Sequence, residues 1–205
     1  MIPGIHVSTA GGIDKAPERL RELGLTAGQI FTASQRRWES PPIAEERVSR
    51  FREKSVGLFF VSHASYLINL ASSRKDVLER SRAALAGELE RCALLGIPSV
   101  VMHPGAHQGA GIEMGVEMIA SALYDILTAR ENGPLLLLEN TAGAGTILGS
   151  RFEELSAIRE LSRVPKGSGT ASIPPMPMEP ATVWTGRAFR KRSEGSLAPE
   201  SKSFT

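Results

Sequence analysis

The stretch from residue 135 to residue 140, Leu-Leu-Leu-Leu-Glu-Asn, decides the fold because an apolar strand-like run leads directly into a carboxylate. Two earlier stretches repeat this design: residues 58–63 read Leu-Phe-Phe-Val-Ser-His, and residues 100–105 read Val-Val-Met-His-Pro-Gly. Each run delivers one metal-ligating side chain just past a strand, and in chain order these are His63, His103 and Glu139. Two imidazoles and one carboxylate, presented from the same end of successive strands, are suitable ligands for zinc.

Strand and helix patterns alternate from the start of the chain to Val164. The expected strands are residues 5–7, 29–31, 58–62, 100–103 and 135–140, and the expected helices are 13–23, 44–55, 76–95, 112–129 and 152–161. Apolar strands between amphipathic helices are typical of a parallel sheet buried on both faces. Five such units predict an α/β fold, either the first part of a TIM-type (β/α)8 barrel or a doubly wound sheet. Both architectures place their chemistry at the carboxyl ends of the strands.

The bulk composition sets loose bounds on function. A chain of 205 residues is one domain's worth, and its net charge of +2 gives no global field that indicates nucleic acid. The single cysteine, Cys92, excludes an internal disulfide, and its helical pattern predicts buried packing. No signal peptide and no membrane-length apolar run are apparent, so we expect a cytoplasmic protein without a membrane partner.

The strand–helix pattern stops after Val164. Six of the thirteen prolines lie beyond it, and four basic residues cluster at 187–192. Such a segment is expected to be irregular, and a basic tail of this kind can attract nucleic acid. We therefore expect two parts, residues 1–164 as a partial barrel and residues 165–205 as an unrelated tail.

The sequence motifs around the three ligand-type residues resemble those of a known family. They are His63-Ala-Ser-Tyr-Leu-Ile-Asn-Leu70, His103-Pro-Gly105 and Glu139-Asn-Thr-Ala-Gly143, together with Gly4-Ile-His-Val-Ser8 and Gln35-Arg-Arg-Trp38. From Met1 to about Val164 the chain resembles endonuclease IV, the zinc-dependent apurinic/apyrimidinic (AP) endonuclease of base excision repair. The resemblance implies a TIM barrel with three zinc ions that cleaves double-stranded DNA on the 5′ side of an abasic site, and it implies a monomer.

The resemblance also assigns roles to matching residues. His63 and His103 correspond to the two histidine ligands of one zinc, and Glu139 to the catalytic carboxylate that bridges this zinc to a second one. A metal pair of this kind activates water and neutralises the charge that develops on a phosphodiester. Manganese uses similar ligands, so the sequence does not fix the metal.

The residues implied to contact DNA lie in two loops and one strand end: Gln35, Arg36, Arg37, Trp38, Tyr66, Leu67 and His6. Aromatic and apolar side chains can enter the base stack where a base is missing, and arginines can bind phosphates. Without the resemblance, Arg36 and Arg37 would be interpreted as a solvated surface pair, and Tyr66 and Leu67 as core residues. Both substrate contact and packing remain open for His6, and His107 is expected to be a loop residue.

The chain departs from the family after Val164. The remaining zinc ligands of endonuclease IV are expected on later strands, yet no histidine follows His107 and no aspartate follows Asp125. Read one nucleotide earlier with suitable codons, residues 173–182 spell Asp-Thr-Ser-His-Ala-Tyr-Gly-Ala-Gly-Tyr, which resembles the next ligand strand. We therefore expect a one-nucleotide frameshift between about residues 163 and 172, a barrel truncated to five units, one zinc rather than three, and impaired activity. The alternatives are an inactive fragment, a non-catalytic remnant that binds abasic DNA, and a metal-dependent sugar isomerase.

Overall fold

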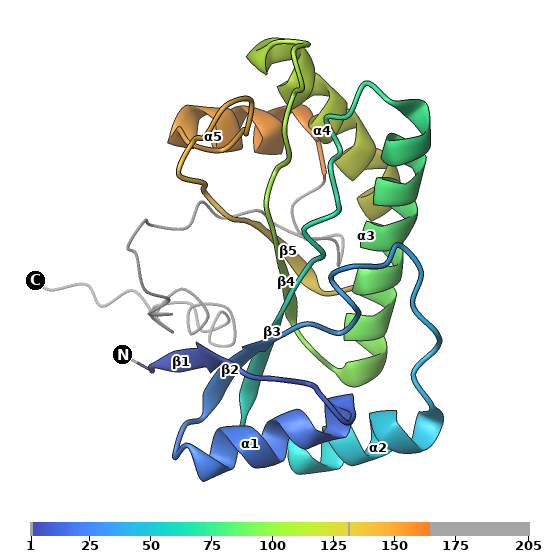
Figure 1. Cartoon of the computed structure of the whole chain (residues 1–205), viewed down its shortest axis with the longest axis vertical. Helices are drawn as coiled ribbons and strands as arrows, with labels where there is room; N and C mark the ends of the chain where they lie inside the picture. Colours follow the sequence, from blue (N-terminus) through green and yellow to red (C-terminus); the bar gives the residue numbers. More distant parts are fainter. Residues whose placement is uncertain (1, 131, 165–205) are drawn as a thin grey trace, which may run out of the picture.

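The computed structural model describes residues 2–130 and 132–164, which form a parallel sheet flanked by helices (Figure 1). In chain order the elements are β1 (Gly4–His6), the 3-10 helix η1 (Ile13–Lys15), α1 (Ala16–Glu22), β2 (Ala27–Ile30), α2 (Glu45–Lys54), β3 (Phe59–His63), α3 (Lys75–Leu95), β4 (Ser99–Met102), α4 (Ile112–Thr128), β5 (Leu135–Leu138) and α5 (Phe152–Leu161). The predictions made for residues 165–205 lie outside the described residues.

The strand order distinguishes a barrel from a doubly wound sheet. The five strands pair in parallel in the order β1-β2-β3-β4-β5, so each strand lies beside the one before it. Parallel crossovers are right-handed, and successive crossovers in one direction place all the helices on the same face of the sheet. Figure 1 shows this arrangement as an arc of helices around one side of the strands. A doubly wound sheet reverses its strand order, so the barrel alternative is confirmed and the doubly wound one is wrong.

The predicted elements are confirmed with shifted ends, and β2 differs most. This strand begins at Ala27, two residues before the predicted start, because Ala27 and Gly28 pair in register with β1 and β3. A Cβ atom at Gly28 would lie 3.2 Å from Phe60 and 3.2 Å from Val7, so a small residue is required there. Small residues carry no apolar signal, which is why the sequence pattern missed this half of the strand.

The core lies between the sheet and the helices. Side chains alternate across each strand, so Phe60 of β3 and Met102 of β4 point toward the helices. Phe60 packs on Phe51 of α2 with ring centroids 5.3 Å apart, and Cys92 of α3 is fully buried, as predicted. Ser62 lies on the same helix-facing side as Phe60, two residues earlier. His63 follows Ser62 and His103 follows Met102, so both histidines belong to the opposite, inner face of the strands.

None of the helices in the described part of the chain is both long enough and apolar enough to cross a membrane.

Candidate metal centre

Three neighbouring strands deliver His63, His103 and Glu139 to one place. The parallel hydrogen-bond ladder continues past the strand ends, because the amide of Ala64 donates to Val101 (2.8 Å) and the amide of Glu139 donates to Met102 (2.9 Å). The two residues just before His103 are therefore held to the neighbouring strands on either side, β3 and β5. This fixes the position of each ligand residue by sheet pairing rather than by a free loop.

The three side chains converge on one oxygen. The Nε2 atoms of His63 and His103 each lie 3.1 Å from Oε2 of Glu139. One ligand atom from each residue can be chosen so that all three lie within 4.8 Å of one another. The His63 side chain is buried at 6% exposure, whereas His103 and Glu139 remain 41% and 31% exposed. The site is therefore held by the protein on one side and accessible from the other.

The hydrogen bond on the far side of the His63 ring fixes its chemistry. Nδ1 of His63 lies 2.7 Å from the carbonyl oxygen of Ala64, which can only accept, so Nδ1 carries a proton. In a neutral ring, Nε2 then presents a lone pair toward the carboxylate of Glu139. Two lone pairs facing each other at 3.1 Å need a positive charge, either a ring proton or a metal ion. A backbone carbonyl that orients the ring in this way is typical of metal-binding histidines.

Glu139 is ionised at any physiological pH. Hydrogen bonds from His103 and His63 lower the pKa of Glu139 to about 2, and these outweigh the effect of burial, which raises it. The triad can therefore offer a metal ion two imidazole nitrogens and one negatively charged oxygen. This donor set fits a zinc ion, for which nitrogen and oxygen ligands are typical.

Asn69 orders the loop that carries His103, although no sequence pattern singles it out. Its side-chain amide donates to the carbonyl of Ala106 (2.9 Å), and its Oδ1 accepts from the amides of Ala106 and Ala71 (both 3.0 Å). Gly105 has a φ of +119°, and a Cβ atom there would lie 2.5 Å from Oδ1 of Asn69. The motif His103-Pro-Gly105 therefore requires glycine at its last position, because the side-chain amide of Asn69 packs against Gly105.

Aromatic rings cover one side of the triad. The Tyr66 ring lies 5.0 Å from the His63 ring and 5.6 Å from the His103 ring, and Phe31 lies 5.7 Å from His63. Tyr66 is 62% exposed, so its interpretation as a core residue is wrong. Phe31 was missed as a site residue. It directly follows β2, at the position where β3, β4 and β5 present His63, His103 and Glu139.

His6, at the end of β1, joins this wall of rings without joining the triad. Its ring packs on Phe31 with centroids 4.4 Å apart. The pKa of His6 is lowered overall, mainly by burial and also by the charge of His63, although a hydrogen bond with Gln29 acts in the opposite direction. The ring of His107 accepts from the amides of Gly109 and Gly111 (3.3 and 3.1 Å), so His107 organises its own loop, in agreement with the prediction.

The loop after β2 meets the loop after β3 beside the triad of His63, His103 and Glu139. Oε1 of Gln35 accepts from the amide of Tyr66 (3.0 Å), which joins the two segments predicted to contact DNA. Leu67 is half-buried, and Arg36 is exposed with its amide donating to Ser34 (3.3 Å).

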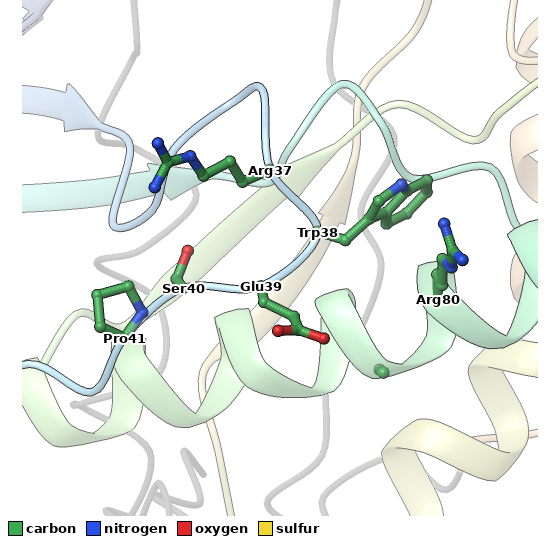
Figure 2. Close-up of a pocket in the computed structure, with 7 residues that line it drawn as sticks. Arg37, Trp38, Glu39, Ser40, Pro41 and Arg80 are labelled. Carbon is green, nitrogen blue, oxygen red and sulfur yellow. The ribbon is translucent and has the colours of Figure 1, made fainter.

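Arg37 and Trp38 lie farther along the loop, in a pocket of about 790 Å³ that is completed by Arg80 of α3 (Figure 2). The other lining residues are Glu39, Ser40, Pro41 and Ala83. Figure 2 shows the Glu39 side chain pointing toward α3. The pocket therefore carries two guanidinium groups against one carboxylate, an excess of positive charge beside the aromatic ring of Trp38.

Comparisons with known proteins place this site in a wider context. The profile of the family described as "Xylose isomerase-like TIM barrel" matches residues 17–166. The chain is 45% identical over 162 residues to a probable endonuclease 4 of Chloroflexus aurantiacus, covering 77% of this chain and 57% of that protein. The chain thus spans a little over half the length of the curated relatives it matches.

Solved structures agree with the sequence relatives. Endonuclease IV of Thermus thermophilus superposes with a TM-score of 0.67 at 43% identity, covering 77% of this chain and 58% of that one. An L-ribulose 3-epimerase superposes with a TM-score of 0.64 at 19% identity, covering 85% and 59%. The second likeness, at this low identity, shows the fold alone.

Proposed function

Because the chain belongs to the xylose isomerase-like TIM-barrel family, we propose that it carries the N-terminal part of a zinc-dependent AP endonuclease, a DNA-repair phosphodiesterase that cleaves 5′ to an abasic site. The observation that carries the proposal is the convergence of His63, His103 and Glu139 in a chain 43–45% identical to endonuclease IV proteins. His63 and His103 bind one metal ion through Nε2. Glu139 is the catalytic carboxylate and binds the same ion.

The residues present would prepare the site for a metal. A bound zinc would supply Lewis acidity toward a phosphodiester, which is otherwise very inert. The protein contributes an ionised Glu139 and a His63 ring whose Nδ1–H is held by Ala64, so that Nε2 faces the metal position. Tyr66 and Phe31 shield one side of the triad from water, which strengthens electrostatic attraction there.

Abasic DNA is the proposed partner, held by the loops after β2 and β3 and by His6. Tyr66 is exposed beside the metal ligands, so its ring can fill the space left by a missing base, with Leu67 next to it. Gln35 fixes this loop through the Tyr66 amide. Arg36 and Arg37 are exposed and can bind phosphates, and Trp38 offers an aromatic surface in the same pocket as Arg37.

The proposal divides the chain at about residue 164, as the sequence suggested. The three ligand residues in the described part of the chain hold one metal ion, and the relatives extend well beyond the matched region. We therefore expect the 205-residue chain to bind abasic DNA while incising it weakly or not at all. We also propose a cytoplasmic protein, which the free, buried Cys92 supports because a reducing compartment keeps thiols free. The monomeric state is proposed from the resemblance alone.

The test compares two duplexes that differ only in one abasic site. Fluorescence anisotropy should show tighter binding to the abasic duplex, and Tyr66→Ala should remove this preference while His107→Ala, which alters a loop residue outside the triad, should keep it. Equal affinity for both duplexes would contradict the proposal. Robust, chelator-sensitive incision would instead contradict the expected impairment and leave the assignment intact. The nucleotide sequence of residues 163–205 tests the frameshift.

A further inference from the structure

A buried carboxylate lies behind the metal ligands, on the helix side of the sheet. Glu88 of α3 is 3% exposed, and its hydrogen-bond partners are other residues than the three of the triad. Its two oxygens accept hydrogen bonds from the hydroxyl of Thr32 (2.8 and 2.7 Å), from the hydroxyl of Ser62, and from the guanidinium of Arg91 (2.6 Å). The thiol of Cys92 also lies 3.6 Å from one of them. The carboxylate is therefore fully partnered, and its charge is balanced by Arg91.

The two hydroxyls belong to residues next to inward-facing residues of the site. Ser62 precedes His63 on β3, and because strand side chains alternate, a bond that holds Ser62 outward sets the backbone that holds His63 inward. Thr32 follows Phe31 after β2, and Phe31 packs against His63 on the inner face. One carboxylate thus holds both strand ends to α3. Arg91 strengthens this attachment by donating to Thr32 as well (2.9 Å).

The neighbouring strands lack this arrangement. The residues that precede His103 and Glu139 are Met102 and Leu138, both apolar and packed in the core. Burying a carboxylate and a guanidinium costs desolvation energy that an apolar side chain avoids, so stability alone does not favour this pair. A buried polar network of this kind instead specifies one geometry. The network is therefore placed to control His63 and not His103.

We propose that Glu88, paired with Arg91, is a positioning residue that fixes the His63 imidazole for metal binding through Ser62 and Thr32. This inference rests on the proposed function in taking His63 as a metal ligand. The inference adds Glu88 to the residues that shape the site. The sequence pattern does not single it out, since Glu88 falls within an ordinary amphipathic helix.

The first test uses the metal-free full chain and needs no activity. The Nδ1–H proton of His63, which donates to Ala64, is followed by nitrogen-15 NMR together with the signals of His103. In Glu88→Gln and Ser62→Ala we expect this proton to exchange with water faster than in the wild type, with His103 unchanged. Thr32→Val, which removes the hydroxyl, should act in the same direction, and Thr32→Ser, which keeps it, should not.

Controls separate positioning from loss of stability. Glu90→Gln removes an exposed carboxylate from the same helix, and Ile119→Val trims a buried side chain of α4. Neither should alter the His63 signal, even where Ile119→Val lowers the free energy of unfolding. If Glu88→Gln fails to fold, Ser62→Ala still decides, because it removes only one hydroxyl. Equal changes at His63 and His103, or no change at His63, would overturn the proposal.

The second test is a Co²⁺ titration followed by the visible absorption of the bound ion. Affinity should fall about tenfold in Ser62→Ala and Glu88→Gln, within the range for residues that orient metal ligands. Wild-type affinity in Ser62→Ala would also overturn the proposal. If the wild-type chain binds no Co²⁺, the proposed function loses its metal centre, while the NMR experiment still decides whether Glu88 positions His63.

Discussion

Replacing Glu139 by glutamine in the metal-free protein should lower the free energy of unfolding only within a defined range of pH. Hydrogen bonds from His103 and His63 lower the pKa of Glu139 from 4.5 to about 2 in the folded protein. A group whose pKa is lowered by folding stabilises the protein above its unfolded pKa and loses that contribution as pH falls toward its folded pKa. The stabilisation should therefore be nearly complete at pH 5, should shrink as pH falls below 4.5, and should disappear as pH falls through about 2.

The structure also sets the size of this effect. Each pKa unit corresponds to about 1.4 kcal/mol, so a fall from 4.5 to about 2 gives an upper limit of about 3 kcal/mol. The Glu139 side chain is 31% exposed, and solvent screening reduces this to about 1–2 kcal/mol. Urea denaturation of chelator-treated protein at pH 5 should show Glu139→Gln less stable than wild type by that amount.

The matched control is Glu117→Gln, which changes an exposed carboxylate of α4 and should leave stability unchanged at both pH values. The reasoning fails if Glu139→Gln is as stable as wild type at pH 5. It also fails if the difference persists undiminished at pH 2, where the carboxylate is protonated in the unfolded state and about half protonated in the folded state.

Three further changes test other parts of the structure. Burial raises the pKa of Asp14, but the Arg50 hydrogen bond and charge hold it below its ordinary value of 3.8. Asp14→Asn should therefore cost about 1–3 kcal/mol at pH 7 by urea denaturation, and this cost should decrease as pH falls below 3.8. Gly28→Ala should cost about 1–3 kcal/mol in thermal melts, since its Cβ would crowd Phe60, whereas Gly133→Ala meets no atom within 4 Å and serves as the control. Arg37→Ala should weaken duplex binding and reduce its salt dependence by about one phosphate contact, and an unchanged salt slope would remove Arg37 from the interface.

Much of the fold followed from apolar runs and helix ends. The run at 135–138 and the Gly96-Ile-Pro98 stop after α3 both predicted elements close to those observed, because burial and capping act locally. The start of β2 did not follow, since Ala27 and Gly28 are selected by close packing against Phe60 rather than by hydrophobicity.

The convergence of the three ligand residues was likewise predictable, because parallel strands bring their carboxyl ends to one edge. The residues that hold them were not. Asn69 bonds Ala106, 37 positions away, and Glu88 bonds Ser62 and Thr32, 26 and 56 positions away. No periodic pattern encodes contacts at such separations. The position of Phe31 directly after β2 indicates that it lies near His63 only when β2 and β3 are known to be adjacent.

The central claim is that His63, His103 and Glu139 bind one zinc ion, and calorimetric titration of the chelator-treated chain with Zn²⁺ tests it most directly. The expected result is one tightly bound ion per chain at pH 7.5, with affinity lost in His103→Ala and in Glu139→Ala and kept in His107→Ala. Absence of zinc binding by the folded wild-type chain, or a stoichiometric site that survives both substitutions, would contradict it.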